Sequence, residues 1–276
     1  MKKKSSIINH QLSIRMLRVG VFDSGLGGLT IVKALTEVIK GAEIFYVADT
    51  KNAPYGEKTP EQILQYSLDV TRYLVEQHQI DGLIIACNTA TSAAVKQIRE
   101  AYSSLVVIGT EPGIKPAFEQ TQTGKVGVLA TPATLKGEKY QKLASDLSKK
   151  QEVTLFEQAC PGLVEQIEKG EIDTEETRTM LENWLRPMRE SDVDTIVLGC
   201  THYPLVSEVI EHVMQRRLNL IHTGDAIAQY SLALSQEYGH LNEGDLDLKL
   251  YATGEISKES VKHIFGKVLK VETIVL

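Results

Sequence analysis

Cysteine is scarce in this sequence: the 276 residues include three, and no two of them form a Cys-x-x-Cys pair. An odd, sparse count argues against a disulfide framework and indicates a reducing compartment. The 8 prolines and 20 glycines are too few for a fibrous or low-complexity chain. We therefore expect an ordinary globular protein whose length allows about two domains, at ~150 residues each.

Long apolar runs and excess positive charge are also missing. No run approaches the ~20 apolar residues of a membrane-spanning helix, and the basic start lacks the apolar stretch of a secretory signal. The 36 acidic residues outnumber the 30 basic ones, so no general positive field exists for nucleic acid or an anionic membrane. We expect a cytoplasmic protein that binds neither, with residues 1–15 as an N-terminal extension or leader.

The sequence instead alternates short apolar runs with longer amphipathic segments. The runs, many rich in Val and Ile, predict strands at 17–22, 43–47, 82–86, 105–108, 125–129, 153–156, 195–198, 219–221, 248–251 and 272–276. The amphipathic segments predict helices at 29–39, 60–77, 90–101, 134–147, 175–190, 205–216, 225–237 and 258–265. Alternation of this kind predicts an α/β fold with mostly parallel strands.

Two segments of the first half return in the second. Residues 19–24 resemble 126–131, and residues 81–87 resemble 194–200, in the same order and at nearly equal offset. The repeat predicts two similar doubly wound lobes: 16–111 completed by 222–276, and 112–221. Each lobe then carries a cysteine just past the carboxyl end of a strand, where open α/β sheets bind ligands. If the lobes face each other, the two thiols converge on one ligand in the cleft.

Both of these cysteines have polar neighbours at the predicted start of a helix. Cys87 precedes Asn88 and Thr89, and free N–H groups with hydroxyls at a helix start suit a carboxylate and lower a thiol pKa. Cys200 precedes Thr201 and His202, and an imidazole can share a proton with a thiol or orient it. The bland alternative is that both are small buried core residues. Cys160, without such neighbours, is predicted to be structural.

Asp23 ends the first predicted strand and leads into a glycine-rich turn at residues 25–28. A dinucleotide fingerprint fails here, because Thr30 stands where the last glycine is needed and an aspartate would repel a pyrophosphate. Asp23 therefore either caps the following helix or serves an ammonium group or a thiol proton. A zinc site of Cys87, Cys200 and His202 is the weaker alternative, because it lacks a closely spaced ligand pair.

Four motifs, in order, resemble those of the glutamate racemases in the aspartate/glutamate racemase family: residues 23–28, 54–56, 86–90 and 199–204. The likeness runs from about Arg18 to the C-terminus. It implies two flavodoxin-like lobes with the active site in the cleft, and interconversion of L- and D-glutamate for peptidoglycan synthesis. It implies no cofactor and no metal. Members of the family are often dimeric, and some with N-terminal extensions are activated by a peptidoglycan precursor.

The resemblance also implies roles for individual residues. It assigns the two bases to Cys87 and Cys200, favouring Cys87 for D-glutamate and Cys200 for L-glutamate, with Asp23 and His202 assisting. It assigns substrate binding to Ser24, Pro54, Tyr55, Gly56, Asn88, Thr89, Thr131, Thr134 and Thr201. Glu168 matches an acid near the histidine, although Glu165 stands where many members have proline. The alternatives are an aspartate racemase of the same family, a two-lobed amino-acid binding protein without catalysis, and a zinc hydrolase.

Overall fold

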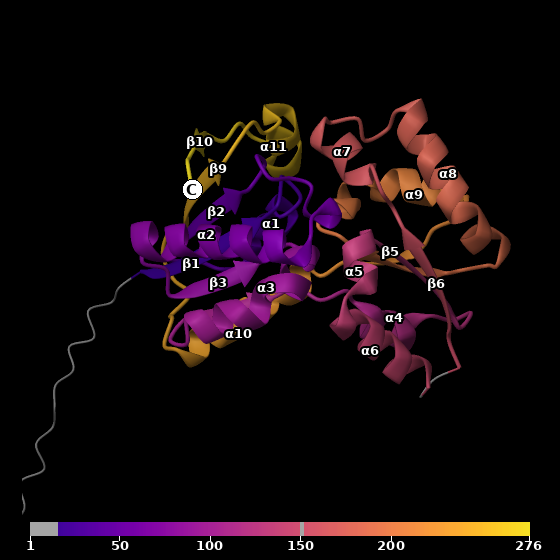
Figure 1. Cartoon of the computed structure of the whole chain (residues 1–276), viewed down its shortest axis with the longest axis horizontal. Helices are drawn as coiled ribbons and strands as arrows, with labels where there is room; N and C mark the ends of the chain where they lie inside the picture. Colours follow the sequence, from indigo (N-terminus) through magenta and orange to yellow (C-terminus); the bar gives the residue numbers. More distant parts are fainter. Residues whose placement is uncertain (1–15, 150–151) are drawn as a thin grey trace, which may run out of the picture.

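The computed structural model describes residues 16–149 and 152–276, so the predicted extension at 1–15 lies outside the described residues. Two separate parallel sheets form its framework (Figure 1). The first has the order β10-β9-β2-β1-β3-β4, and its strands are β1 (Leu17–Asp23), β2 (Ala42–Ala48), β3 (Gly82–Ile85), β4 (Val106–Gly109), β9 (Asp247–Ala252) and β10 (Val271–Thr273). The second has the order β6-β5-β7-β8, and its strands are β5 (Lys125–Ala130), β6 (Thr154–Ala159), β7 (Thr195–Gly199) and β8 (Asn219–Ile221).

Helices cover the sheets and make two lobes that lie side by side in Figure 1. Around the first sheet are α1 (Leu29–Val38), α2 (Pro60–His78), α3 (Asn88–Ala101), α10 (Gly224–Glu237) and α11 (Lys258–Phe265), with the short 3₁₀ turn η1 (Tyr55–Glu57). Around the second are α4 (Ile114–Gln120), α5 (Pro132–Lys136), α6 (Glu138–Ser148), α7 (Leu163–Glu168), α8 (Glu175–Glu190) and α9 (Ser207–Met214), with the 3₁₀ turn η2 (Tyr203–Val206). The predicted two-lobed α/β fold is confirmed.

Burial on both faces explains why the strands read as apolar runs. In β1, Val21 packs into one apolar cluster and Phe22 into another, because successive strand residues point to opposite faces. Every residue of β7 is buried. Continuous Val and Ile runs are therefore needed, as in other parallel sheets covered by helices.

The helices differ from the sequence prediction at four places. The single helix predicted at 134–147 is divided at Gly137 into α5 and α6. The short helices α4 and α7 were not predicted, because seven and six residues are too few to show a helical period. The predicted helix at 205–216 is preceded by the 3₁₀ turn η2, which has Pro204 near its start, and α9 begins only at Ser207.

The carboxyl ends of the central strands of both sheets meet between the lobes. Asp23 ends β1, and Cys87 follows β3 by two residues. Thr131 and Cys200 directly follow β5 and β7 of the other sheet. Hydrogen bonds join the two sides, from Thr201 Oγ1 to Asp23 Oδ1 at 3.2 Å and between the Thr89 and Thr131 hydroxyls at 3.0 Å.

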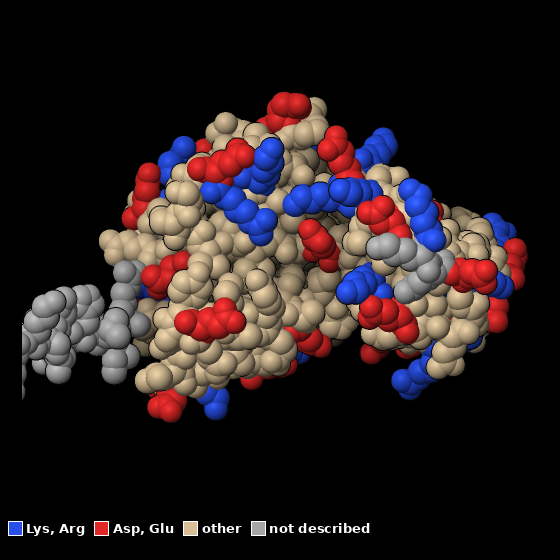
Figure 2. Space-filling view, turned by 90° about the horizontal axis from the view of Figure 1, so that it is seen from below, with Lys and Arg blue, Asp and Glu red and all other residues tan. Residues whose placement is uncertain are grey.

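The outer surface carries both signs of charge. Figure 2 shows Lys and Arg interspersed with Asp and Glu on the face it displays. Across residues 16–149 and 152–276, no helix has the length and apolar character to cross a bilayer.

Candidate active site

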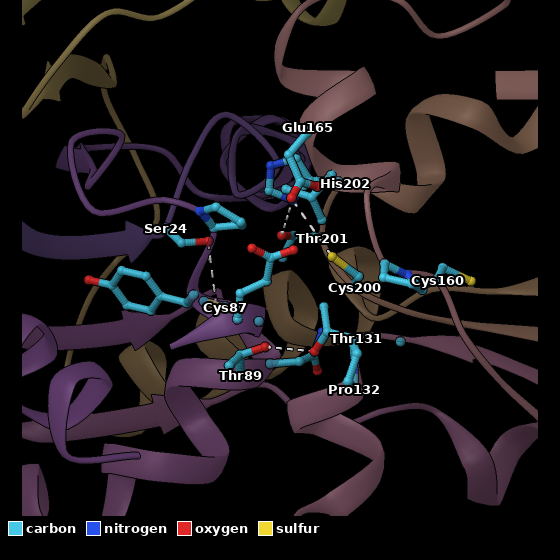
Figure 3. A pocket seen from close by; sticks show the side chains of 18 of the residues that line it. Ser24, Cys87, Thr89, Thr131, Pro132, Cys160, Glu165, Cys200, Thr201 and His202 are labelled. Atoms are coloured by element: carbon cyan, nitrogen blue, oxygen red, sulfur yellow. Dashed lines mark hydrogen bonds between the residues drawn. The ribbon is translucent and has the colours of Figure 1, made fainter. Parts of the chain in front are cut away.

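A small cavity of about 30 Å³ lies where these strand ends meet (Figure 3). The predicted site residues that line it are Ser24, Pro54, Tyr55, Gly56, Cys87, Asn88, Thr89, Thr131, Cys200, Thr201 and His202. The other three, Asp23, Thr134 and Glu168, do not line it and instead contact residues that do. The structure therefore brings the whole predicted set together.

Cys87 is placed by the start of α3. It is the residue before the helix, and its sulfur accepts a hydrogen bond from the Ala90 N–H at 3.4 Å while its thiol donates to Ser24 Oγ at 3.8 Å. The helix start was expected to lower the pKa of this thiol. Burial and the nearby Asp23 charge outweigh that effect, so the pKa of Cys87 is raised. These surroundings therefore favour the thiol form of Cys87.

Cys200 lies beside the imidazole of His202. Its sulfur lies 3.6 Å from Nδ1 of His202, whose other ring nitrogen, Nε2, lies 2.6 Å from Glu168 Oε1. Burial alone would lower the pKa of His202, but the hydrogen bonds to Cys200 and Glu168 raise it well above its ordinary value. His202 and Glu168 therefore form a hydrogen-bonded pair beside the Cys200 sulfur. The two cysteines thus have opposite surroundings, although they occupy equivalent strand ends.

Asp23 holds the glycine turn and does not contact Cys87 through a hydrogen bond in the described structure. Its Oδ2 accepts hydrogen bonds from Gly25 N–H at 3.2 Å and Gly28 N–H at 3.1 Å. Burial raises its pKa. A Cβ at Gly27 would lie 2.5 Å from His202 Nδ1, so the turn needs glycine to let the lobes approach.

Threonine hydroxyl groups from both lobes lie close together at another part of the cavity wall. Thr89 Oγ1 lies 3.0 Å from Thr131 Oγ1 and 3.3 Å from Thr134 Oγ1. Thr131 also caps α5 by accepting from Thr134 N–H at 3.2 Å. Beside them, the buried Asn88 Oδ1 has no hydrogen-bond partner among the described residues, which suits a donor such as an ammonium group.

The Tyr55 hydroxyl is engaged by a buried carboxylate. It donates to Asp49 Oδ2 at 2.6 Å, and Thr253 Oγ1 donates to the other oxygen of the same carboxylate at 2.7 Å. What the loop can offer a ligand is therefore the apolar ring of Tyr55 and its backbone.

Sequence reasoning missed some of the cavity wall. Glu57 of η1 and Glu165 of α7 line the cavity from opposite lobes, and burial followed by the charge of Glu57 raises the pKa of Glu165. Cys160 also lines it, although its thiol points away from Cys200 (Figure 3) and donates to Gln158 O at 3.6 Å. Glu57 and Glu165 are far apart in the sequence, and no motif connects them, so only the fold reveals that both line the cavity.

Within residues 16–149 and 152–276, no three His, Cys, Asp or Glu side chains are grouped so as to hold a metal ion. The thiols of Cys87, Cys160 and Cys200 are all free.

Comparison with known proteins agrees with this arrangement. Residues 28–230 match the family model described as Asp/Glu/Hydantoin racemase. A glutamate racemase of Sulfurovum sp. is 69% identical over 248 residues, which cover 90% of this chain and 94% of that protein.

Two solved glutamate racemases have a similar fold. A glutamate racemase isoform from Bacillus anthracis has a TM-score of 0.81 at 30% identity, covering 94% of this chain and 98% of that one. The Escherichia coli glutamate racemase, solved with L-glutamate and the activator UDP-MurNAc-ala, has a TM-score of 0.80 at 27% identity over the same shares of the two chains. The chain therefore belongs to the Asp/Glu/hydantoin racemase family.

Proposed function

We propose that this protein is a glutamate racemase that interconverts L- and D-glutamate without a cofactor, by two-base proton transfer at Cα. The observation that carries the proposal is the placement of Cys87 and Cys200, which come from opposite lobes and line one cavity. The 69% identity to a glutamate racemase supports the choice of glutamate. The product D-glutamate would serve peptidoglycan synthesis.

Two bases solve the geometric problem of racemisation. The Cα proton leaves one face of the substrate and a proton returns to the other, which a single fixed base cannot do without moving. One thiol must start as thiolate and the other as thiol, and the roles exchange for the other enantiomer. The surroundings described above favour the thiol form of Cys87. Cys200 beside His202 is then the starting base, which deprotonates L-glutamate in the assignment favoured here.

Local groups rather than the overall charge recognise the substrate, because the protein carries a net charge of −6. The start of α3 and the hydroxyls of Thr89 and Thr201 suit the α-carboxylate. Asn88 Oδ1 suits the ammonium group. The carbanion-like transition state adds charge beside this carboxylate, so fixed N–H and O–H donors there lower the barrier most. The backbone of Tyr55 and Gly56 is assigned to the side-chain carboxylate.

The division into lobes is part of the proposal. We assign 16–111 with 222–276 to one lobe and 112–221 to the other, supported by the strands in each sheet. We also propose a cytoplasmic location and a homodimer. Activation by a peptidoglycan precursor is proposed from the Escherichia coli relative, which was solved with such an activator.

The test is proton exchange at Cα in D₂O, followed by NMR with each glutamate enantiomer after treatment with a chelator. We expect deuterium at Cα and formation of the opposite enantiomer, with aspartate a poor competitor. Binding without exchange would instead identify an amino-acid binding protein. Loss of activity with chelator would identify a metal enzyme, and faster turnover of aspartate would reassign the substrate.

The two cysteines are tested by single substitution. Cys87→Ser and Cys200→Ser should each lower kcat by roughly 10²–10⁴-fold, the range for losing a general acid or base. Circular dichroism of the product gives the rate. Cys160→Ser, which removes the third thiol of the same cavity wall, serves as the matched control. Near-normal turnover in either of the first two variants would refute the two-base assignment.

A further inference from the structure

A second cavity, of about 70 Å³, lies behind Cys200. It is lined by Thr30 and Ile31 of α1, by Leu198, Cys200, Thr201 and Pro204 around the end of β7, and by residues 222–225 at the start of α10. Cys200 and Thr201 are the two residues that also line the substrate cavity. These two residues therefore form a wall with the substrate on one side and the second cavity on the other.

The burial of its walls shows that this cavity runs from the interior to the surface. Leu198, Cys200 and Thr201 on the inner side are buried. His222 and Asp225 on the outer side are exposed. A space of this size has room for a few water molecules, and polar groups line it at both ends. Thr30 Oγ1, which donates to Gly27 O at 2.8 Å, is still able to accept a hydrogen bond there.

Cys87 has different surroundings. Both cysteines belong to buried apolar clusters, but the Cys87 sulfur is engaged by Ser24 and the Ala90 N–H. Cys87 lines the substrate cavity but not the cavity behind Cys200. When the lobes are closed, the two thiols therefore differ in their access to water.

We propose that the cavity behind Cys200 is a water passage through which this thiol exchanges its proton with solvent while substrate remains bound. The inference rests on the proposed function, because it requires Cys200 to act as a base. In D₂O the step is S–H plus D–O–D giving S–D plus H–O–D, which balances without another reactant. Reprotonation of the carbanion by Cys200 then returns a deuteron to the face from which the proton came.

The passage predicts an asymmetry between the enantiomers. The substrate that Cys200 deprotonates, L-glutamate in the assignment favoured here, should gain deuterium in its own recovered pool before it is converted. The substrate that Cys87 deprotonates should be recovered with its proton retained. Mass spectrometry of both enantiomers, separated by chiral chromatography at low conversion, measures this directly.

A second experiment fills the passage with a side chain. Gly224 lines the cavity, and a Cβ there would make only ordinary contacts, the nearest at 3.6 Å from His222 Nδ1. Gly224→Leu fills the passage, while Gly224→Ala leaves most of it open. We expect the Leu variant to racemise but to lose the wash-in of deuterium into recovered substrate, and the Ala variant to keep it.

The outcomes separate the inference from the function beneath it. A wild-type enzyme that racemises but shows equal wash-in for both enantiomers would overturn the passage and leave the racemase assignment intact. Unchanged wash-in in a folded, active Gly224→Leu variant would also overturn it. Absence of any exchange and any racemisation would instead refute the proposed function. The comparison of enantiomers in wild-type protein decides the matter even if the Leu variant does not fold.

Discussion

Glu168 uses one carboxylate oxygen for two contacts across the cleft. Its Oε1 accepts from the Leu26 N–H at 2.6 Å and lies 2.6 Å from His202 Nε2. Leu26 belongs to the glycine turn of the first lobe, whereas Glu168 and His202 belong to the second. The carboxylate therefore orients the imidazole that faces Cys200 and also fixes the position of the opposite lobe.

Removing this charge should affect one direction of the reaction more than the other. In Glu168→Gln the pKa of His202 falls, because the carboxylate charge that raises it is lost while the amide oxygen can still accept a hydrogen bond. We expect kcat to fall more for the enantiomer deprotonated by Cys200, with the limb of the pH profile due to His202 moved to lower pH. Steady-state kinetics over a pH series measures both.

The lowered pKa of His202 in Glu168→Gln should also change how stability depends on pH. A raised pKa for His202 stabilises the fold fully below its ordinary value of 6.5, and this contribution is lost as pH rises through the folded-state pKa. Glu168→Gln should therefore lose more stability at acidic than at alkaline pH. Glu175→Gln, at an exposed position in α8, is the control. Identical pH profiles for wild type and Glu168→Gln would contradict this role.

Residue types and spacing were enough to single out the proposed bases but not their surroundings. Cys87 and Cys200 stand out because equivalent strand ends carry both. Their different surroundings depend on Asp23 and Glu168, which are distant from the cysteines in sequence and reach the site only through tertiary packing. The Tyr55 hydroxyl likewise could not be excluded as a ligand contact before its bond to Asp49 was visible.

At the scale of elements, α2 ends in a stack of rings on the first sheet. His78 lies between Phe45, at 4.3 Å between ring centroids, and Tyr251, at 5.1 Å, and Tyr73 meets it edge-on at 5.3 Å. Partial burial, followed by the charges of Lys249 and Arg18, lowers the pKa of His78. The stack thus favours a neutral imidazole.

This stack should make the first lobe sensitive to acid. A lowered pKa gives stability that is present above 6.5 and is lost as pH falls through the folded-state value. His78→Phe keeps a ring without a titrating group, so its Tm should fall less than that of wild type on acidification. Calorimetry at neutral and acidic pH measures the difference, with His263→Gln at an exposed position as the control. An equal fall in His78→Phe and wild type would argue against the stack as the cause.

Strands and helices follow from the sequence where the segment is long enough to show its repeat. The strands and the longer helices follow from apolar runs and amphipathic segments, because burial on two faces or on one imposes those patterns. The helix α7 was missed because six residues cover less than two turns, yet it supplies both Glu165 and Glu168. A helix that the sequence pattern does not reveal therefore supplies two acidic residues at the site.

For the whole molecule, the size of the substrate cavity implies movement. A volume of about 30 Å³ has room for only a few water molecules, and both thiols are buried. We therefore expect the lobes to separate to admit substrate and to close again around it, breaking and remaking contacts such as the Thr89–Thr131 hydrogen bond. Closure also excludes water from the charged intermediate.

Thiol labelling tests this movement. In a Cys160→Ala background, iodoacetamide should modify Cys87 and Cys200 slowly, at a rate set by opening, and saturating glutamate should slow it further. Thr131→Val, which removes a hydroxyl between the lobes, should speed labelling in the absence of substrate. Peptide mass spectrometry gives the rate at each cysteine. Labelling that glutamate does not slow would mean that the thiols are reached without opening of the cleft.

The polypeptide passes between the two sheets twice, once from β4 to α4 at residues 110–113 and once from β8 to α10 at residues 222–223. A cavity of about 530 Å³ lies against both crossings, with Gly113 and Thr223 among its walls. Two crossings between the lobes define a hinge axis. The lobes should therefore swing about one line rather than twist freely, and each closure returns Cys87 and Cys200 to the same opposed alignment.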